Sequence, residues 1–415
     1  MIESDICIIG AGPAGMMAAI AAAGAKKVII LESNTTAGRK LLLTGGGRCN
    51  ITHTGTIDEF LRAYKPFDRF ARHCIHEFPP DKTRGFFASR GLPTIAEPAG
   101  CVFPKTNRAD DVKQVLTDEL KKLNVRIFYD KKVKSIKKHE DLFTIQSEKF
   151  EVSARSIIIA TGGLSWPITG STGDGYSFAK NFGHNIIKPT PTLVPLITAE
   201  KFCSTLAGTG VKNVKISCKI DNKKISSAGA MIFTHSGIGG PAVFDFSRTI
   251  AETLNKSKKN LAVSIDLLAD MKTDELDKKL SDCLIQNARQ TVVSVLAKFL
   301  PKALARHICL QENLAETNAS QISKKSRKNL SGKLKDFPLT VVSPEPIERA
   351  TVTRGGVDIT QIDPKTMQSK LCDGLFFAGE VINVDGPCGG YNLQFAFSSG
   401  ILAGKSAVDL QPQRH

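Results

Sequence analysis

The sequence predicts an α/β protein in which both ends of the chain build one parallel-sheet domain and the middle is inserted into it. Short apolar runs that lead into glycine-rich turns occur near both ends, at residues 6–15 and 374–390. After prolines at positions 189, 191 and 195 the pattern changes to short strands, and residues 273–334 have helical periodicity. The predicted parts are a discontinuous domain (1–190 and 345–415), a β-rich insert (191–270 and 335–344) and a small helical insert (271–334).

The opening of the chain has the pattern of a βαβ unit that binds a dinucleotide. The apolar run Ile6–Ile9 predicts a buried strand, and the Ala-rich run Met16–Ala23 predicts the helix that follows. Glycines at positions 10, 12 and 15 give G-x-G-x-x-G between them. A second apolar run, Val28–Leu31, ends at the acidic Glu32. Because all parts occur in the required order, the sequence favours a dinucleotide site over a chance glycine-rich turn.

Each part of this unit has a physical role. Gly10 permits the tight strand-to-helix turn, Gly12 lets backbone N–H groups approach a pyrophosphate, and Gly15 lets the helix pack closely on the strand. The phosphates lie at the positive end of the helix dipole. The carboxylate of Glu32 can accept hydrogen bonds from ribose hydroxyls.

Composition narrows the class of protein. A chain of 415 residues is long enough for two or three domains. Its ten cysteines include no C-x-x-C pair and no metal-type cluster, which indicates reduced thiols, a cytoplasmic location and no metal site, and argues against a flavin-linked disulfide reductase. No apolar run is long enough to cross a bilayer, so no membrane partner is expected. The net charge of +16 raises nucleic acid as a partner, but charge alone supports only arguments about solubility and steering.

A second glycine-rich loop follows the βαβ unit. Gly45, Gly46 and Gly47 are preceded by Lys40 and followed by Arg48. Bare backbone between basic side chains suits a loop that lies against a flat or anionic ligand. The leucines at positions 41–43 indicate anchoring in a core, which favours this interpretation over a flexible surface turn.

The next elements lead to a further strand of the same sheet. Arg108–Leu123 predicts an amphipathic helix, and three short alternating runs (125–129, 133–137 and 143–147) predict a β-meander. Residues 156–163 predict a buried strand that ends in Ala160-Thr161-Gly162-Gly163. Open parallel sheets bind ligands at the carboxyl ends of their strands, so these small residues are expected beside a cofactor.

Two features of the inserted parts have both a functional and a structural interpretation. His235 lies in the Gly-rich stretch 233–241 and could be a proton donor, although a hydrogen-bonded structural histidine is the commoner case. The helical insert is basic toward its end, where few aromatic residues accompany the charges, so a solvated face is favoured over a nucleic-acid patch. The basic residues are Lys324, Lys325, Arg327, Lys328, Lys333 and Lys335.

The end of the chain repeats the style of its beginning. An apolar run at residues 374–378 leads into Gly379-Glu380, and Gly389-Gly390 precede a run of small and apolar residues at 395–407. This predicts a buried strand and a buried helix whose N-terminus is aimed at a ligand. In flavin enzymes such a helix end stabilises negative charge on the reduced ring.

Together these motifs resemble the YhiN/BaiN-like flavoprotein family, which is also labelled aminoacetone-oxidase-like. The likeness rests on G-x-G-P-A-G at 10–15, G-R-K to G-G-G-R-C-N at 38–50, A-T-G-G at 160–163, G-S-T-G-D-G at 170–175, T-H-x-G-I-G-G-P at 234–241 and G-E to G-G-Y-N-L-Q at 379–394. It implies non-covalent FAD on a glutathione-reductase-type Rossmann domain, a β-barrel-like insert and a small helical insert.

The resemblance also implies which residues bind the cofactor. Gly12, Pro13, Ala14 and Gly15 would hold the pyrophosphate and Glu32 the adenosine ribose. The rest of the implied site, after the turn at Gly10, is Lys40, Gly46, Gly47, Arg48, Asn50, Val133, Ala160, Thr161, Gly162, Gly379, Glu380, Asn392 and Leu393. Val133 is placed only by its position in the strand after the amphipathic helix. Cys388 stands where the family often has a small hydroxyl residue and is given no role.

The first functional hypothesis is an FAD-dependent oxidoreductase with a small-molecule substrate. The chain has no second Rossmann fingerprint, so NAD(P)H is expected as a transient electron donor. The substrate would be an unsaturated carbonyl such as a steroid-like enone, which is reduced, or a small amine, which is oxidised. Arg48, His235 and Tyr391 are the candidates for orienting or protonating it.

Two other hypotheses remain. The basic excess allows an RNA-associated flavoprotein similar to the GidA type of tRNA-modifying enzyme, although nucleic acid is the less favoured partner. A flavin-bound protein without catalysis, acting as a sensor, is the third. Rapid bleaching of the flavin by NADH or NADPH would favour the enzyme over the sensor.

Overall fold

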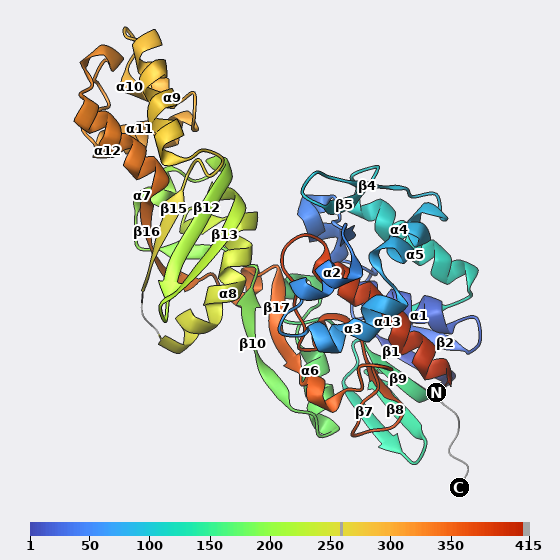
Figure 1. The fold of residues 1–415 in the computed structure, drawn as a ribbon. Coiled ribbons are helices and arrows are strands. Elements are labelled where there is room, and N and C mark those ends of the chain that lie inside the picture. Colours follow the sequence, from blue (N-terminus) through green and yellow to red (C-terminus); the bar gives the residue numbers. More distant parts are fainter. Residues whose placement is uncertain (258–259, 410–415) are drawn as a thin grey trace. The chain divides into compact units, whose positions relative to one another are not determined.

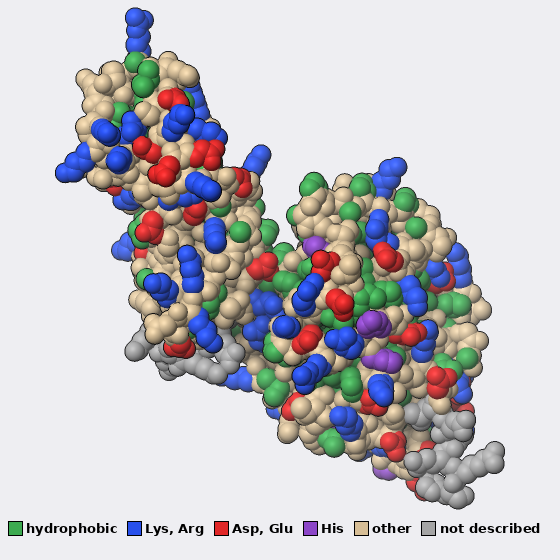
Figure 2. Space-filling view, in the orientation of Figure 1, with side chains coloured by type: hydrophobic (Ala, Val, Ile, Leu, Met, Phe, Trp, Pro, Cys, Tyr) green, Lys and Arg blue, Asp and Glu red, His purple; other side chains and the backbone are tan. Residues whose placement is uncertain are grey.

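The structure is a computed structural model, and it describes residues 1–257 and 260–409. The chain forms two compact units, each with its own hydrophobic core. Unit 1 consists of Met1–Pro191 and Thr351–His415, and unit 2 of Thr192–Ala350 (Figure 1). Lys and Arg side chains are spread over the visible surface of both units (Figure 2). None of the described helices is long and apolar enough to cross a membrane.

A parallel sheet lies at the centre of unit 1. Its parallel strands follow the order β6 (Arg126–Phe128), β2 (Val28–Leu31), β1 (Ile2–Ile9), β9 (Phe150–Ile159) and β18 (Leu375–Phe377). The register of β1 sets Ile9 opposite both Leu31 and Ile159, so the three strands end together. The last of these strands comes from the far end of the chain, as predicted from its apolar run.

The predicted meander is only partly correct. β7 (Ser135–His139) and β8 (Leu142–Ser147) form an antiparallel ribbon that continues onto the first half of β9. The run at 125–129 instead supplies β6, a parallel edge strand beside β2. A strand shows the same alternation of buried and exposed residues whether it lies in an antiparallel ribbon or at the edge of a parallel sheet. Its place beside β2 depends on the preceding helix, α5 (Ala109–Lys122), which connects it to the rest of the chain.

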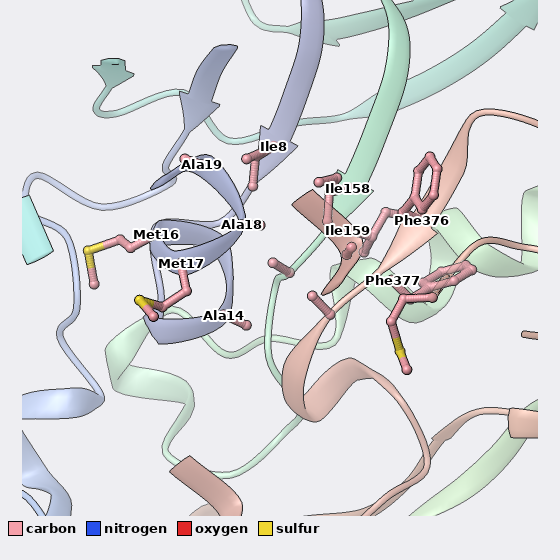
Figure 3. Packing of buried hydrophobic residues seen from close by; sticks show 14 of the residues in the cluster. Ile8, Ala14, Met16, Met17, Ala18, Ala19, Ile158, Ile159, Phe376 and Phe377 are labelled. Carbon is pink, nitrogen blue, oxygen red and sulfur yellow. The ribbon is translucent and has the colours of Figure 1, made fainter. Parts of the chain in front are cut away.

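Helices α1 (Pro13–Ala22) and α13 (Tyr391–Asp409) pack against each other. Met16 and Ala19 of α1 and Phe376 and Phe377 of β18 belong to one buried core (Figure 3). The helices approach closely because α13 places glycines at the contact. A Cβ atom added at Gly400 would lie 2.3 Å from the carbonyl oxygen of Ala14.

The remaining elements of unit 1 surround this core. The helices are α2 (Ile57–Ala63), α3 (Asp68–Glu77), α4 (Pro80–Ala88) and α6 (Asp174–Asn181). A small sheet has the order β3 (Thr52–His53), β5 (Cys101–Pro104) and β4 (Thr94–Ala96), and β10 (Ile186–Thr192) pairs with β17 (Val352–Val357).

Unit 2 contains a closed barrel, which confirms the predicted barrel-like insert. The strand order is β11 (Leu196–Thr198), β14 (Gly237–Gly239), β13 (Lys223–Phe233), β12 (Gly210–Ile220), β15 (Leu261–Asp266) and β16 (Phe337–Pro344). The short α7 (Phe202–Thr205) and the long α8 (Pro241–Ser257) accompany it, and α8 packs on β13. Between β15 and β16 the chain forms α9 (Thr273–Gln286), α10 (Val292–Leu296), α11 (Lys302–Gln311) and α12 (Lys324–Lys335). The predicted α/β fold with a barrel and a helical part is therefore confirmed.

Half of the basic face of the helical insert is paired within the fold. Arg327 makes a two-pronged contact with Asp277 at 3.0 Å for each bond. Lys333 pairs with Glu312 at 2.9 Å, and Lys335 pairs with Asp266 at 2.6 Å. Lys324, Lys325 and Lys328 are exposed. The interpretation of α12 as a solvated face rather than a nucleic-acid patch stays a prediction.

Candidate functional site

A cavity opens in unit 1 where the central strands and two helices end. It is lined by the carboxyl ends of β1, β2 and β9, by the first turns of α1 and α13, and by the segments around Lys40 and Glu380. Elements from both ends of the chain thus surround one space. This is the edge of a parallel sheet at which ligands bind.

Most of the predicted cofactor residues line this cavity. They are Gly10, Gly12, Pro13, Ala14, Glu32, Lys40, Val133, Ala160, Thr161, Gly162, Gly379, Glu380, Asn392 and Leu393. Gly15, Gly46, Gly47, Arg48 and Asn50 are not among the lining residues. Gly15 acts in packing instead, since a Cβ atom there would lie 2.0 Å from the carbonyl oxygen of Gly10.

The N-terminus of α1 is built to receive an anion. Gly12 is the N-cap residue, and it provides no side-chain hydrogen bond to the first turn, which contains no acidic residue. A Cβ atom added at Gly12 would have no atom within 4 Å, so the backbone there faces open space. Unpaired N–H groups and the positive end of the helix dipole together favour a phosphate at this point.

Glu32 lies at the end of β2 and is almost fully buried. Its Oε2 accepts a hydrogen bond from the backbone N–H of Ala11 at 2.8 Å. Its Oε1 accepts from the backbone N–H of Asn34 at 2.8 Å and from the Asn34 side chain at 2.6 Å. These donors orient the carboxylate beside the glycine-rich turn, where a carboxylate binds ribose hydroxyls in Rossmann folds.

A charged network lines the other part of the cavity. The Lys40 ammonium lies 2.6 Å from Glu380 Oε2 and donates to the Ser165 hydroxyl at 2.6 Å. Glu380 Oε1 accepts from the Ser165 hydroxyl at 2.9 Å and from the backbone N–H of Thr353 at 2.8 Å. Burial alone would raise the pKa of Glu380, but the Lys40 charge and these hydrogen bonds outweigh it and hold the pKa below its ordinary value. Glu380 is therefore ionised at neutral pH.

Two buried hydroxyl groups near this network have no hydrogen-bond partner within the described part of the chain. One is Thr161 Oγ1, on a residue that lines the cavity. The other is the Tyr176 hydroxyl, whose pKa is raised by burial and by the nearby Glu380 carboxylate. An orphaned hydroxyl at the cavity wall, together with the uncapped helix and the oriented carboxylate, fits a bound dinucleotide cofactor with polar groups along its length.

The glycine-rich loop that follows Lys40 is held in place by contacts with residues in and next to strands β4 and β5. Arg48 pairs with Glu97 at 2.7 Å, and its guanidinium lies 3.9 Å from the centre of the Phe103 ring. Asn50 accepts a hydrogen bond from the backbone N–H of Val102. Burial raises the pKa of Cys49 to about 12, which favours the protonated thiol at neutral pH.

Tyr391 begins α13 and lies in a group of aromatic rings. It stacks on His53 with ring centres 4.9 Å apart and contacts Phe60 at 4.6 Å. The Tyr64 hydroxyl donates to the carbonyl oxygen of Tyr391 at 2.7 Å. The adjacent Asn392 holds the preceding turn through hydrogen bonds with both backbone groups of Gly386. These contacts fix the first turn of the helix at the cavity.

The third candidate for substrate chemistry lies in the other unit. His235 is exposed in the loop between β13 and β14 of unit 2. Arg48 and Tyr391 thus belong to unit 1, which contains the cavity, and His235 belongs to unit 2.

Several lining residues were missed in the sequence. They include Asn34, Lys131, Lys132, Thr169, Asp174, Thr351 and Val384. The G-S-T-G-D-G motif at 170–175 indicates part of this lining, because it is a glycine-rich turn that leads into the first turn of α6. Asn34 carries no motif, and only its contacts with Glu32 and the carbonyl oxygen of Thr169 show its place.

Comparison with known proteins agrees with this geometry. Residues 4–406 match the family described as HI0933-like protein Rossmann domain. A 3-dehydro-bile acid delta(4,6)-reductase from Clostridium scindens is 32% identical over 97% of this chain and 99% of its own length. A ribosomal RNA dihydrouridine synthase from Escherichia coli is 30% identical over 98% of this chain and 100% of its own length.

Solved structures support the fold. A 3-ketosteroid delta1-dehydrogenase from Sterolibacterium denitrificans is 12% identical, covers 99% of this chain and 100% of its own, and has a TM-score of 0.54. With a family match over nearly the whole chain and a cavity that fits FAD, this chain belongs to the HI0933-like family of FAD-dependent oxidoreductases.

Proposed function

We propose that this protein uses FAD to reduce a carbon–carbon double bond conjugated with a carbonyl group. The main support is a single cofactor cavity that is built from both ends of the chain. The chain is also similar to two proteins whose names describe that chemistry. A delta(4,6)-reductase of a 3-oxo steroid reduces carbon–carbon double bonds that are conjugated with the ketone. Dihydrouridine is uridine whose ring double bond, next to a carbonyl, has been reduced.

The chain's own residues would bind and fix the cofactor. The first turn of α1 would hold the pyrophosphate, and Glu32 the ribose. Lys40 and Glu380 would fix the wall beside the ribityl and ring portion, and the N-terminus of α13 would stabilise negative charge there. When bound, FAD supplies the hydride that the substrate receives.

NAD(P)H is proposed as the electron donor, and it would bind transiently. The sequence has only one G-x-G-x-x-G fingerprint, and the cavity that contains it would be filled by FAD. A cytoplasmic location suits this donor, and all ten cysteines are free thiols, as expected in a reducing compartment.

Arg48, Tyr391 and His235 remain the proposed groups for orienting or protonating the substrate. Arg48 and Tyr391 lie on segments next to cavity-lining residues, whereas His235 is proposed from the sequence alone. The variants Arg48→Gln, Tyr391→Phe and His235→Gln would each be tested by the rate at which substrate reoxidises the reduced flavin. Unchanged rates in all three would remove these residues from the proposal.

Two substrates of this chemistry are favoured over a small amine. A steroid-like enone is one, since the bile acid reductase is 32% identical to this chain. Uracil in RNA is the second candidate, because the dihydrouridine synthase is 30% identical and the net charge is +16. A polyanionic substrate is attracted by such a charge.

Anaerobic stopped-flow spectroscopy tests the proposal. The flavin is expected to bleach rapidly with NADH or NADPH and to regain its colour with a 3-oxo-Δ4 steroid or with uridine-containing RNA. An amine that bleaches the flavin without NAD(P)H would show the oxidase alternative. A flavin that NAD(P)H reduces but that neither unsaturated substrate reoxidises would overturn the proposed reaction.

A further inference from the structure

The outward face of α3 is a stripe of basic side chains next to the cofactor-binding core. Arg69, Arg72, His73 and His76 are all exposed. Their spacing of three, four and seven residues places them on one side of a helix, over about 10 Å of its length. Phe70, Ala71, Cys74 and Ile75 lie on the opposite side and are buried. We call these four exposed residues the α3 stripe.

The two arginines of the α3 stripe have guanidinium groups that can bind an anionic ligand. Neither Arg69 nor Arg72 has an ion pair or hydrogen bond with any described side chain. The helix has an acidic residue at each end. Glu77 is paired with Lys405 at 2.5 Å, and Asp68, which is half-buried next to Arg69, forms no ion pair with either arginine among the described residues. In the view of Figure 2, histidine side chains and Lys or Arg side chains gather where Figure 1 draws α3.

This face is tied to the cofactor cavity by direct packing within unit 1. Helix α3 packs against α13, whose Asn392 and Leu393 line the cavity. Helix α2, which precedes α3, contributes Phe60, and Tyr64 follows it; both touch Tyr391 at the start of α13. The stripe therefore belongs to the same rigid packing arrangement as the helix end at the cavity.

We propose that the α3 stripe binds the phosphate backbone of an RNA substrate and presents a uracil base to the protein. This inference rests on the proposed reductase function and chooses RNA between its two substrates. Arginine is suited to the task because its guanidinium donates two parallel hydrogen bonds to a phosphate, and imidazole N–H groups can add further contacts. Contacts of this kind position a nucleic acid without reading its sequence.

The chemistry of the face argues against a membrane. An interfacial helix inserts an apolar face among lipid chains, but the apolar face of α3 is buried in the protein core. The exposed face offers charge alone. An acidic protein partner is kept as an outcome of the experiment.

The experiment measures binding of the FAD-loaded protein to a fluorescent, uridine-rich single-stranded RNA by anisotropy, over a series of salt concentrations. The test variant is Arg69→Gln/Arg72→Gln, and Arg69→Lys/Arg72→Lys keeps the charge. The matched control is Lys219→Gln/Lys224→Gln, which removes the same charge from exposed positions that face each other on β12 and β13. Flavin content and the helical signal in circular dichroism show that each variant is folded.

We expect the Gln variant of the stripe to bind RNA about tenfold more weakly and to lower the salt slope by about 0.7 for each phosphate that it no longer neutralises. The Lys variant should keep most of the affinity, and the control should stay within about twofold of the parent. Equal decreases in affinity in the stripe variant and the control would mean general attraction by net charge and would overturn the proposal. Competition by polyglutamate or anionic vesicles as strong as that by RNA would also overturn it.

The failure of this inference can be told from failure of the proposed function. A protein that binds no RNA, but whose reduced flavin is reoxidised by a steroid enone, would refute the stripe and leave the reductase intact. A protein that binds RNA through the stripe while NAD(P)H leaves its flavin oxidised would refute the proposed electron donor only.

Discussion

The ion pair of Lys40 and Glu380 joins residues 340 positions apart and is the chemical centre of the cavity wall. Each side chain is about one-fifth exposed, so the charges are only partly solvated. A carboxylate in this position depends on its partner, because removing one member of a buried pair leaves an uncompensated charge.

Lys40→Met is expected to destabilise unit 1 by about 2–3 kcal/mol at neutral pH, which is less than the loss of about 3–5 kcal/mol when a fully buried pair is broken, because both side chains are partly exposed. In the parent protein the pKa of Glu380 is lowered on folding, so its stabilisation is present at neutral pH and is lost as acid protonates it. Without Lys40, burial raises that pKa instead. The variant should therefore become more stable as the pH falls from neutral toward the ordinary pKa of Glu.

Urea unfolding of the parent and variant at several pH values measures this difference. Lys40→Met/Glu380→Gln is the control, because it removes the carboxylate and should recover part of the stability with no pH dependence from this site. A Lys40→Met protein equally destabilised across the whole range would contradict the account.

At the residue scale, the sequence predicts many of the residues that line the cavity, but fewer of the hydrogen bonds and ion pairs between them. Gly12, Glu32, Lys40 and Glu380 belong to motifs with fixed spacing, and each lines the cavity. The bond between Lys40 and Glu380 could not be predicted, because no local pattern links two residues so far apart in the chain. Asn34 could not be predicted either, because it belongs to no motif and only its hydrogen bonds with Glu32 place it at the cavity.

At the scale of elements, the crossing of α1 and α13 positions both helix ends at the cavity. Gly400 and Gly404, one turn apart, face the backbone of α1. A Cβ atom on them would lie 2.3 Å from the carbonyl oxygen of Ala14 and 2.2 Å from that of Ala18. The contacts are to backbone, so no side chain can move aside.

Gly400→Ala is expected to push α1 away from α13, since the added methyl group has no room. Overpacking of this kind costs about 1–3 kcal/mol, and the displacement of Ala14 should also weaken FAD binding. Thermal unfolding and the amount of flavin retained after gel filtration measure the two effects.

Gly85→Ala is the matched control. Gly85 lies inside α4, and a Cβ atom there would have no atom within 4 Å. Because alanine loses less backbone entropy on folding, this variant should gain about 0.5–1 kcal/mol and keep its flavin. Similar effects of the two substitutions would show that the helix crossing is less tight than described.

Element type was easier to predict from the sequence than element partners. The helix predicted at 108–123 forms as α5, and the apolar runs near both ends form β1, β2 and β18. The run at 125–129 forms a strand, but beside β2 rather than in the ribbon of β7 and β8. Alternation reports which side of a strand is buried, whereas pairing depends on the path of the intervening chain.

At the scale of the whole molecule, each unit has its own core. Most of the buried apolar residues of unit 1 form one cluster, and most of those of the barrel and its helices form another. Domains with separate cores can unfold in separate steps.

FAD should therefore stabilise one of these steps selectively. A ligand present at one hundred times its dissociation constant adds about 2.7 kcal/mol to the folded state that binds it. We expect excess FAD to shift one unfolding transition and leave the other in place, as followed by calorimetry. A single transition that excess FAD shifts as a whole would show that the chain unfolds as one cooperative body.

The connection between the units allows a stronger test. Strands β10 and β17 form a two-stranded sheet, so the chain leaves and re-enters unit 1 through neighbouring strands. Replacing residues 192–350 with a short Gly/Ser linker should leave the sheet, α1, α13 and all cavity-lining residues in place. The shortened protein is expected to be yellow and to bind FAD with an affinity within a few-fold of the parent. Insoluble or colourless protein would mean that unit 1 needs unit 2 to fold, which two separate cores do not predict.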